Sequence, residues 1–374
     1  MHEFFPSNYR WSYNALLAFA AGGQLGDIAL ILPRLLASNN DDLAWHREWA
    51  WLARVLEGRA ASGTTQTAFA NYLLASLYHT ISEHFIPPTE PLRLQSYGEV
   101  LRTFDEARKH APYEIARVEI PYEGASLPAY FVPARAPAGA KNPAAIFVCG
   151  LDTTKELWFL RARAEFAERG INALFIDTPG IGEALRLRAL VTRFDYEKPI
   201  TAALEWLAQR PEVDPTRIAA VGSSLGGYYV TRAAAFEPRL AAVVAWGVIY
   251  DYREVWVKRM SSVGGAVAAP KFQLMFVTGA DSMEDAMDRI ADFRVQGVGA
   301  RVACPYLLMH GERDRQVPEG DAQAMFDAVG SRDKEMVIFD GTNGGSAHCQ
   351  FDNHLPALQV CADWLVRKLG NERR

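Results

Sequence analysis

Residues 218–227 read Ile-Ala-Ala-Val-Gly-Ser-Ser-Leu-Gly-Gly and give the strongest indication of the architecture. A short apolar run leads into the pattern Gly-x-Ser-x-Gly and then into a segment of helical periodicity. In this setting the pattern is typical of a sharp strand-to-helix turn that exposes the hydroxyl of its central serine, Ser224. Gly222 and Gly226 lack the Cβ atoms that would clash in such a turn. We therefore expect Ser224 to be a catalytic nucleophile; the alternative is a serine in an ordinary strand–helix turn.

Short apolar runs alternate with helical segments on both sides of this motif. The expected strands are residues 115–120, 127–132, 144–149, 173–176, 218–221, 241–246, 306–309 and 336–339, and the first two should form a hairpin. The expected helices are residues 158–168, 199–209, 226–236, 320–328 and 355–369. Buried strands separated by helices are typical of a mostly parallel sheet with helices on both faces. The predicted fold class is therefore α/β and doubly wound.

The N-terminal part of the chain has a different pattern. Apolar residues at helical spacing predict helices over residues 12–21, 25–36, 42–57, 65–86 and 92–110. Residues 39–42 and 61–64 supply turn and N-cap residues between them. We expect a helical cap domain over residues 1–112 and a catalytic domain over residues 113–374. The stretch from about 248 to 299 is too long for one connection, and its helical periodicity predicts an inserted helical lid.

A nucleophilic serine needs a neighbouring base that is itself oriented by an acid. In this fold class the order along the chain is serine, acid, histidine, and three histidines follow Ser224. His348 lies in a glycine-rich loop after the last expected strand and is the predicted base. His310 closes a strand and is expected to be a packed structural residue, whereas His354 begins a helix and is expected to cap it or to be solvated.

The loop after the penultimate strand contains the expected acid. It reads His310-Gly-Glu-Arg-Asp314, and Asp314 lies far enough past the strand to reach the histidine. An acid at this place fixes the tautomer of His348 and stabilises the imidazolium that forms during attack. Glu312 is the competing candidate, but it lies nearer the strand end.

The oxyanion hole is expected to use the backbone amide of Leu225 and an amide from the loop after residues 144–149. Leu151 is the predicted second donor, because this loop contains no His-Gly-Gly-Gly motif. Asp152 could point into the same cavity, or it could cap the helix that begins near Lys155. Asp152 and Tyr228 are the expected substrate-binding residues.

Other features argue against several function classes. The formal net charge of −5 leaves no basic excess for a dedicated nucleic-acid binder. No cluster of histidine, cysteine and acidic residues has metal-ligand spacing, so we expect neither a metal nor a cofactor. Residues 177–183 contain glycines but no dinucleotide or phosphate-loop motif, which favours a simple turn after a strand. Trp45, Trp49 and Trp51 fall on one expected helix and either form core or line a substrate cavity.

Cysteine usage and hydropathy indicate the compartment. The four cysteines form no Cys-x-x-Cys pair, which is typical of reduced thiols in a cytosolic protein. The apolar stretch from Ala15 to Leu36 is interrupted by polar residues and is too polar for a membrane span. No N-terminal signal peptide is evident. We expect a cytoplasmic protein whose partner is a small-molecule substrate, with no nucleic acid and no membrane, and whose cap could form a homodimer contact.

Several motifs together resemble those of a known family. They are the expected hairpin, Gly150-Leu-Asp-Thr-Thr-Lys-Glu156, Asp177-Thr-Pro-Gly-Ile-Gly-Glu183, the serine motif, His310-Gly-Glu-Arg-Asp314, and Gly345-Ser-Ala-His-Cys349. In these motifs the chain is similar to the α/β-hydrolases related to 2,6-dihydroxypseudooxynicotine hydrolase, a group that includes enzymes that shorten aromatic polyketides. The likeness covers most of residues 113–374, and the helical N-terminal region agrees with the cap of that family.

The resemblance implies hydrolysis of a C–C bond beside a ketone, a reaction of retro-Claisen type with Ser224 as the attacking group. It also implies a site role for Asp152, which stands where family members carry a cavity glutamate and is shorter by one methylene. A carboxylesterase or thioesterase acting on a bulky substrate is the alternative enzyme. A ligand receptor without catalysis is the alternative of another class, although an intact set of Ser224, Asp314 and His348 argues against it.

Overall fold

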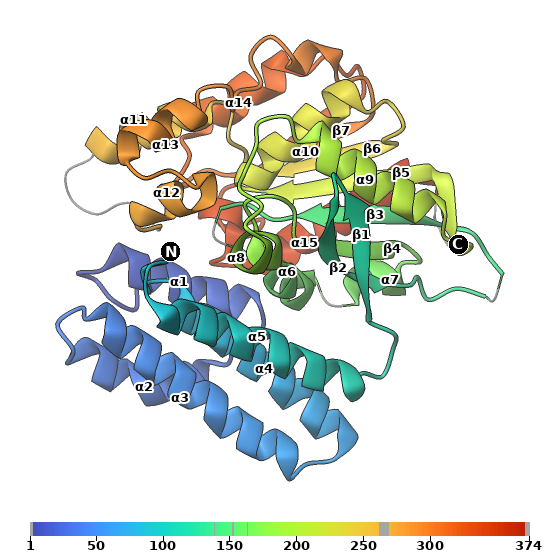
Figure 1. Ribbon diagram of the computed structural model, residues 1–374. Coiled ribbons are helices and arrows are strands. Elements are labelled where there is room, and N and C mark those ends of the chain that lie inside the picture. The colour runs from blue at the N-terminus through green and yellow to red at the C-terminus, as the bar shows by residue number, and fades with distance from the viewer. Residues whose placement is uncertain (1–2, 138, 152, 163, 262–268, 371–374) are drawn as a thin grey trace.

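In the part of the chain that the structure describes, eight strands form one sheet in the order β1-β2-β4-β3-β5-β6-β7-β8 (Figure 1). The computed structural model describes residues 3–370 except 138, 152, 163 and 262–268. The strands are β1 (Ala116–Tyr122), β2 (Ala125–Val132), β3 (Asn142–Val148), β4 (Asn172–Ile176), β5 (Val213–Ser223), β6 (Ala242–Trp246), β7 (Tyr306–Gly311) and β8 (Lys334–Phe339). β1 and β2 form an antiparallel hairpin, β2 pairs antiparallel with β4, and the remaining pairs are parallel. The predicted mostly parallel sheet is confirmed.

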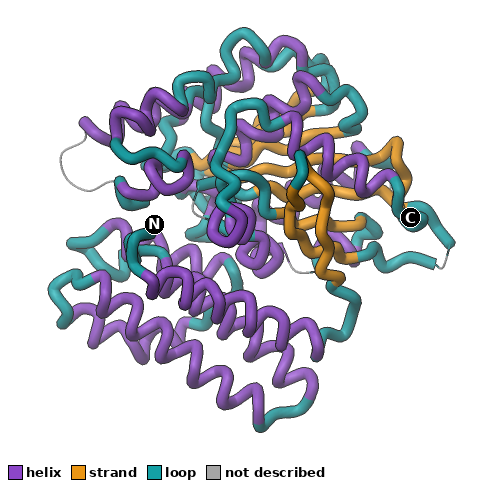
Figure 2. The backbone as a smooth tube through the Cα atoms, in the orientation of Figure 1, coloured by secondary structure: helices purple, strands orange, loops and turns teal. Residues whose placement is uncertain are grey.

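Helices cover both faces of the sheet. One face carries α9 (Glu197–Ala208), α10 (Leu225–Phe236) and α14 (Glu319–Ala328), and the other carries α6 (Lys155–Ala162), α7 (Glu165–Glu168) and α15 (His354–Lys368) (Figures 1 and 2). The strands between them are almost wholly apolar and buried; every residue of β3, β4 and β6 is buried. Strands that are covered on both faces need such continuous apolar sequences. One expected helix, residues 158–168, is instead the two helices α6 and α7.

Five helices precede the sheet. They are α1 (Tyr9–Ala20), α2 (Leu25–Leu36), α3 (Asp42–Ala61), α4 (Thr65–Glu83) and α5 (Pro91–Lys109), and we call them together the cap helices. The side chains of Asp41 and Thr64 accept hydrogen bonds from the first-turn amides of α3 and α4, as their N-cap positions predicted. Phe104 of α5 stacks on Tyr130 of β2 with ring centroids 4.4 Å apart. The cap helices therefore pack directly on the hairpin edge of the sheet and on α6.

Between β6 and β7 the chain forms further short helices. They are α11 (Tyr252–Ser261), α12 (Phe272–Thr278) and α13 (Met283–Arg289), at the upper left of Figure 1, followed by a 3₁₀ turn at Gly299–Arg301. Helical structure was expected here, although α13 ends earlier than the apolar pattern through Phe293 suggested. Within the described residues, no helix combines the length and the apolar character that crossing a bilayer requires.

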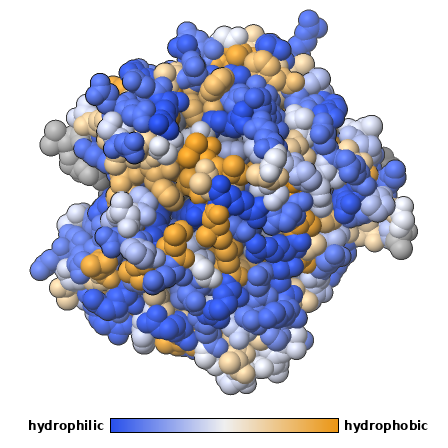
Figure 3. All heavy atoms as spheres, in the orientation of Figure 1, coloured by the Kyte–Doolittle hydropathy of each residue, from blue (hydrophilic) through white to orange (hydrophobic). Residues whose placement is uncertain are grey.

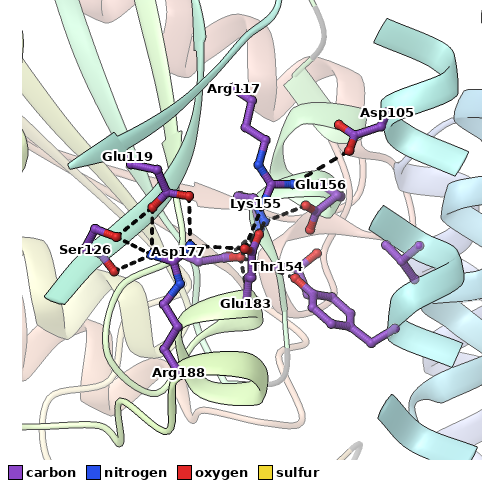
Figure 4. A network of polar contacts seen from close by, with 12 residues as sticks. Asp105, Arg117, Glu119, Ser126, Thr154, Lys155, Glu156, Asp177, Glu183 and Arg188 are labelled. Atoms are coloured by element: carbon purple, nitrogen blue, oxygen red, sulfur yellow. Dashed lines mark hydrogen bonds and ion pairs between the residues drawn. The ribbon is translucent and has the colours of Figure 1, made fainter. Parts of the chain in front are cut away.

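A buried cluster of charges joins the loops after β3 and β4 (Figure 4). The ammonium of Lys155 lies 2.7 Å from Glu156, 3.0 Å from Asp177 and 2.9 Å from Glu183, and all four side chains are almost completely buried. Asp177 also accepts hydrogen bonds from the backbone amides of Lys155 (2.7 Å) and Glu183 (2.8 Å). Glu183 stands in α8 (Gly182–Arg188).

The local sequence explains how this cluster forms. An added Cβ at Gly182 would lie 2.1 Å from a carboxylate oxygen of Asp177, so only glycine allows the chain to turn so closely around that carboxylate. Residues 177–183 are therefore a turn after a strand, as expected. The turn also encloses the carboxylate of Asp177, which accepts most of the hydrogen bonds in the cluster. Tyr97 of α5 donates a long hydrogen bond of 3.5 Å to Asp177, which brings the cap helices into contact with the same group.

Replacing Lys155 tests how much stability this cluster contributes. In Lys155→Met the buried carboxylates lose their shared cation, and we expect the free energy of unfolding to fall by about 3–5 kcal/mol. The matched control is Lys109→Met, which removes a surface ion pair to Glu106 and should cost at most about 1 kcal/mol. Urea unfolding followed by fluorescence measures both. Equal losses in the two variants would contradict a central role for Lys155.

Candidate active site

Ser224 lies at the sharp turn between β5 and α10. Its backbone has φ 59° and ψ −122°, a left-handed φ that non-glycine residues rarely adopt. The turn is held by two backbone hydrogen bonds, from the amide of Ser224 to the carbonyl of Trp246 (2.7 Å) and from the amide of Gly227 to the carbonyl of Ser224 (2.9 Å). A Cβ at Gly222 would lie 2.0 Å from the carbonyl oxygen of Gly226. Strand and helix can therefore meet at this angle only with glycine at that position.

The structure brings the hydroxyl of Ser224 together with His348 and Asp314. Nε2 of His348 lies 2.9 Å from Oγ of Ser224, and Nδ1 of His348 lies 2.5 Å from Oδ2 of Asp314. These residues follow β5, β7 and β8, and the ends of parallel strands meet at one edge of the sheet. The hydroxyl, the imidazole and the carboxylate thus form one hydrogen-bonded sequence, the arrangement that a serine nucleophile, a base and an acid would need. Glu312, the competing acid, is exposed at the surface.

The loop that carries His348 is fixed at several points. The amide of Arg313 donates to the carbonyl of Ser346 (2.9 Å), which ties the loop to the end of β7. The carboxylate of Asp352 accepts the amides of Ser346 (3.2 Å) and Ala347 (3.0 Å). A Cβ at Gly311 would lie 2.3 Å from the carbonyl oxygen of Ser346, so the loop packs on bare backbone. The imidazole therefore stands at a defined place over the sheet.

The charges of Asp314 and His348 stabilise each other. Burial raises the pKa of Asp314, but His348 and the backbone amides of Gln316 (2.7 Å) and Val317 (2.9 Å) favour the carboxylate, and the net pKa is lowered. Burial lowers the pKa of His348, but the carboxylate of Asp314 more than reverses this, so the net pKa is raised above the ordinary value of about 6.5. Asp314 therefore favours the protonated imidazole.

The amide of Leu225, the expected first oxyanion donor, directly follows Ser224 in the chain. It belongs to the first turn of α10, where amides have no partner within the helix. The bare Cα of Gly150 faces it, because a Cβ there would lie 3.0 Å from the Leu225 nitrogen and 2.8 Å from Cβ of Ser224. Leu151, the second expected donor, lines the same pocket as Ser224. Both expected donors thus lie beside the nucleophile.

Ser224 and His348 line the same pocket. Its wall includes Tyr13 and Asn14 of α1, Arg259 of α11, and Gln316. The molecular outline is indented where the cap helices face α11 and α12 (Figure 3). The cap helices and α11 therefore contribute to the pocket wall together with the loops around Ser224. The residues from α1 and α11 were not predicted from the sequence because no local motif marks them.

Gln316 connects the two sides of the pocket. Its amide nitrogen donates to the hydroxyl of Tyr9 (2.8 Å), and its side-chain oxygen accepts from Arg259 at 3.5 Å. Its backbone amide donates to Asp314. A single residue thus joins α1, α11 and the acid.

Tyr228 and Asp152, the expected substrate-binding residues, have different outcomes. Tyr228 is buried in α10, its hydroxyl donates to the backbone carbonyl of Phe194 (2.9 Å), and its ring stacks on Phe293 at 5.7 Å. It does not line the Ser224 pocket. This corrects the expectation: one residue past the motif the helix points its side chain into the protein. Asp152 lies outside the described residues.

The remaining candidate histidines and tryptophans have packing roles. His310 is buried and Nε2 lies 3.1 Å from the carbonyl oxygen of Val317, consistent with a structural residue. His354 is buried and stacks on Trp246 with centroids 5.0 Å apart, so the expectation of a solvated side chain is wrong. Trp45 and Trp49 stack on each other in the cap core, while Trp51 is partly exposed.

One group in the described residues has side chains suited to a metal. Glu57, His79 and Glu99 of the cap helices offer ligand atoms within 4.8 Å of one another. The guanidinium of Arg102 lies 2.5 Å from carboxylate oxygens of both Glu57 and Glu99. A cation already neutralises this cluster, and it lies away from the Ser224 pocket.

Comparison with protein families places the chain among hydrolases. A family model described as FrsA-like esterase matches residues 39–369. The hydrolase acrC of Aspergillus aculeatus is 30% identical over 429 residues, which cover 100% of this chain and 99% of the relative. The 2,6-dihydropseudooxynicotine hydrolase of Paenarthrobacter nicotinovorans is 30% identical over 251 residues, which cover 67% of this chain and 63% of the relative.

Solved structures show the same architecture. The crystal structure of 2,6-dihydroxy-pseudo-oxynicotine hydrolase superposes with a TM-score of 0.80 at 24% identity and covers 95% of both chains. AbyA5 superposes with a TM-score of 0.69 at 21% identity and covers 87% of this chain and 89% of that one. These likenesses confirm the predicted α/β-hydrolase fold with a helical N-terminal region, and the resemblance inferred from the motifs is confirmed with them.

Titration of His348 tests the coupling between Asp314 and the imidazole. In the unaltered protein we expect His348 to titrate above pH 6.5, because the carboxylate stabilises the imidazolium. In Asp314→Asn burial acts without that carboxylate, so the pKa should fall below the ordinary value of about 6.5. Histidine-selective NMR measures both, with Glu312→Gln as the exposed control. An unchanged titration in Asp314→Asn would contradict the coupling.

Proposed function

The chain belongs to the family of FrsA-like esterases, and on that premise we propose that it is a serine hydrolase in which Ser224, His348 and Asp314 are the catalytic triad. Its homologues are named hydrolases and esterases, so the chain is a hydrolase. The observation that carries the finer proposal is the hydrogen-bonded sequence from Ser224 Oγ through His348 to Asp314, at 2.9 and 2.5 Å. Ser224 and His348 both line a pocket whose wall includes residues of the cap helices.

Each residue has a defined step in this mechanism. Oγ of Ser224 attacks the substrate carbonyl, and Nε2 of His348 takes the hydroxyl proton. Asp314 holds Nδ1 of the imidazole and stabilises its positive charge. The amides of Leu225 and Leu151 would donate to the oxyanion of the tetrahedral intermediate. His348 then returns the proton to the leaving group, and a water molecule activated by the same imidazole releases the acyl group from Ser224.

The bond that we propose to be cleaved is a C–C bond beside a ketone, in an aromatic or polyketide-like substrate. When the tetrahedral intermediate collapses, the electron pair of that bond passes to the leaving carbon as an enol or enolate, and the proton from His348 completes it. Support comes from the relative named 2,6-dihydropseudooxynicotine hydrolase and from the motifs shared with C–C hydrolases. The description of the family as esterases favours a carboxylesterase as the second candidate.

Covalent labelling of Ser224 tests the nucleophile. Intact mass after incubation with a fluorophosphonate should increase by one adduct, and Ser224→Ala should remain unlabelled and lose turnover by about 10⁴-fold or more. The exposed Ser62→Ala is the matched control and should behave like the unaltered protein. A labelled Ser224→Ala would refute the assignment, and the absence of any adduct in the unaltered protein would favour a non-catalytic receptor.

Paired substrates distinguish the two bonds. We compare p-nitrophenyl acetate with an aromatic compound that carries a 1,3-diketone. Dominant cleavage of the diketone supports the C–C hydrolase, because only that substrate offers a carbon leaving group stabilised as an enolate. Turnover of the ester alone would replace this proposal with a carboxylesterase.

Gly150→Ala tests the proposed oxyanion hole. The added Cβ would lie 2.5 Å from the carbonyl oxygen of Ser223, 2.8 Å from Cβ of Ser224 and 3.0 Å from the Leu225 nitrogen, so it would shift the serine turn and obstruct that amide. We expect kcat to fall by about 10²–10³-fold, the effect of losing one oxyanion donor. Gly98→Ala is the matched control, since its Cβ would meet no atom within 4 Å. If kcat in Gly150→Ala stays normal, the donor lies elsewhere.

A further inference from the structure

Arg161 lies in α6 beneath the turn that carries Ser224. Its side chain is buried, with the residue only 5% exposed. Three aromatic rings enclose the guanidinium, whose central carbon lies 4.2 Å from the ring centroid of Trp158, 4.8 Å from that of Phe351 and 5.4 Å from that of Trp246. Its Nη1 donates to Oγ of Ser223 at 3.3 Å, so its one hydrogen bond among the described residues reaches the neighbour of the nucleophile.

The charge of Arg161 has no counter-ion in the described residues. Among the residues that the structure describes, which do not include Asp152, no carboxylate lies within ion-pair distance of Arg161, and Nε and Nη2 have no hydrogen-bond acceptor. Other buried cations are paired: Arg93 lies 3.0 Å from Glu83, and Lys155 lies 3.0 Å from Asp177. Arginine stays protonated in proteins even when buried. An uncompensated buried charge is costly to stability, and such groups are found preferentially where function requires them.

The thiols of Cys149 and Cys361 do not neutralise this cation. Burial raises the pKa of Cys149 and of Cys361, so both thiols are protonated and neutral at pH 7. His354, which stacks on Trp246, contributes no negative charge in either protonation state. Asp314 is already engaged by His348 and by two backbone amides. Among the described residues, no carboxylate thus pairs with Arg161 in the resting protein.

We propose that Arg161 is a positioning residue for the reaction at Ser224: it holds Ser223, and its charge, which has no counter-ion among the described residues, is matched by the oxyanion that forms when Ser224 attacks a carbonyl. This inference rests on the proposed serine-hydrolase function. In a low-dielectric interior a fixed charge acts over several ångströms. Arg161 has no negative partner among the described residues before the attack and gains one when the oxyanion forms. Its charge therefore stabilises the transition state more than it stabilises the bound substrate. The effect therefore belongs to kcat rather than to KM.

The test separates this role from a purely structural one. Arg161→Met keeps the aliphatic stem and removes the charge, and Arg161→Lys keeps a charge. The matched control is Arg210→Met, because Arg210 also stacks on a tryptophan, at 4.8 Å from Trp206, but precedes β5 at the end opposite Ser224. For each variant we measure kcat and KM, inhibition by phenylboronic acid and the melting temperature. Phenylboronic acid forms a tetrahedral anionic adduct on a nucleophilic serine.

For Arg161→Met we expect kcat to fall by about tenfold or more, while KM stays within about twofold of the value for the unaltered protein. Phenylboronic acid should inhibit this variant more weakly, by about the same factor as the fall in kcat. Arg161→Lys should recover part of the loss, and Arg210→Met should match the unaltered protein. The melting temperature of Arg161→Met should stay equal or rise, because an apolar side chain relieves an unmatched buried charge.

The opposite pattern would overturn the inference. A lower melting temperature with unchanged kcat and unchanged boronate inhibition would make Arg161 a structural support for its aromatic neighbours. Should Arg161→Met fail to fold, Arg161→Gln provides a second neutral variant for the same comparison. Full activity in Ser224→Ala would instead remove the proposed function itself, a failure that the labelling experiment distinguishes from a failure at Arg161.

Discussion

The left-handed backbone of Ser224 is the constraint on which the site depends. A non-glycine residue at φ 59° costs about 1–3 kcal/mol and persists only where the surroundings enforce it. Here Gly222 and Gly226 touch across the turn, and Gly150 leaves space beside it. The same compression raises the hydroxyl of Ser224 above the strand ends, where the loops after β7 and β8 bring Asp314 and His348. Without this turn the serine would follow the strand direction and the three residues would not meet.

Close contact at the turn also determines what lies around it. The loop after β3 must pass over the turn on bare glycine, and its next residues lead directly into α6, whose first residue is Lys155. Lys155 is bound to Asp177 after β4, and Asp177 contacts Tyr97 of the cap helices. A chain of contacts thus runs from the serine turn through a buried ion cluster to the cap. The cap helices that line the pocket are therefore positioned by the same elements that position the nucleophile.

Sequence patterns predicted the elements well because their signals are local. Periodicity gave the strands and helices to within a few residues, and the Gly-x-Ser-x-Gly pattern together with chain order led to Ser224, Asp314 and His348. The pocket wall could not be predicted in this way: Tyr13, Arg259 and Gln316 are far apart in sequence and carry no motif. The expectation that Tyr228 binds substrate failed for a related reason. A place next to a motif on a helix does not specify on which face of the helix the side chain lies. The environment of Arg161 could not be predicted from the sequence either, because only the fold shows that no acid among the described residues pairs with it.

The two buried cations of α6 show how burial separates structural from functional charge. Lys155 stands at the start of the helix among three carboxylates, and its charge is matched in the resting protein. Arg161 stands six residues later among aromatic rings, with its charge unmatched in the described residues. Burial removes both Lys155 and Arg161 from water at a cost in free energy, but only for Lys155 do carboxylates among the described residues offset that cost. In natural proteins, destabilising groups are retained mainly where activity requires them. A buried Arg161 without a counter-ion among the described residues is therefore more readily explained by a role in the reaction than by a role in folding.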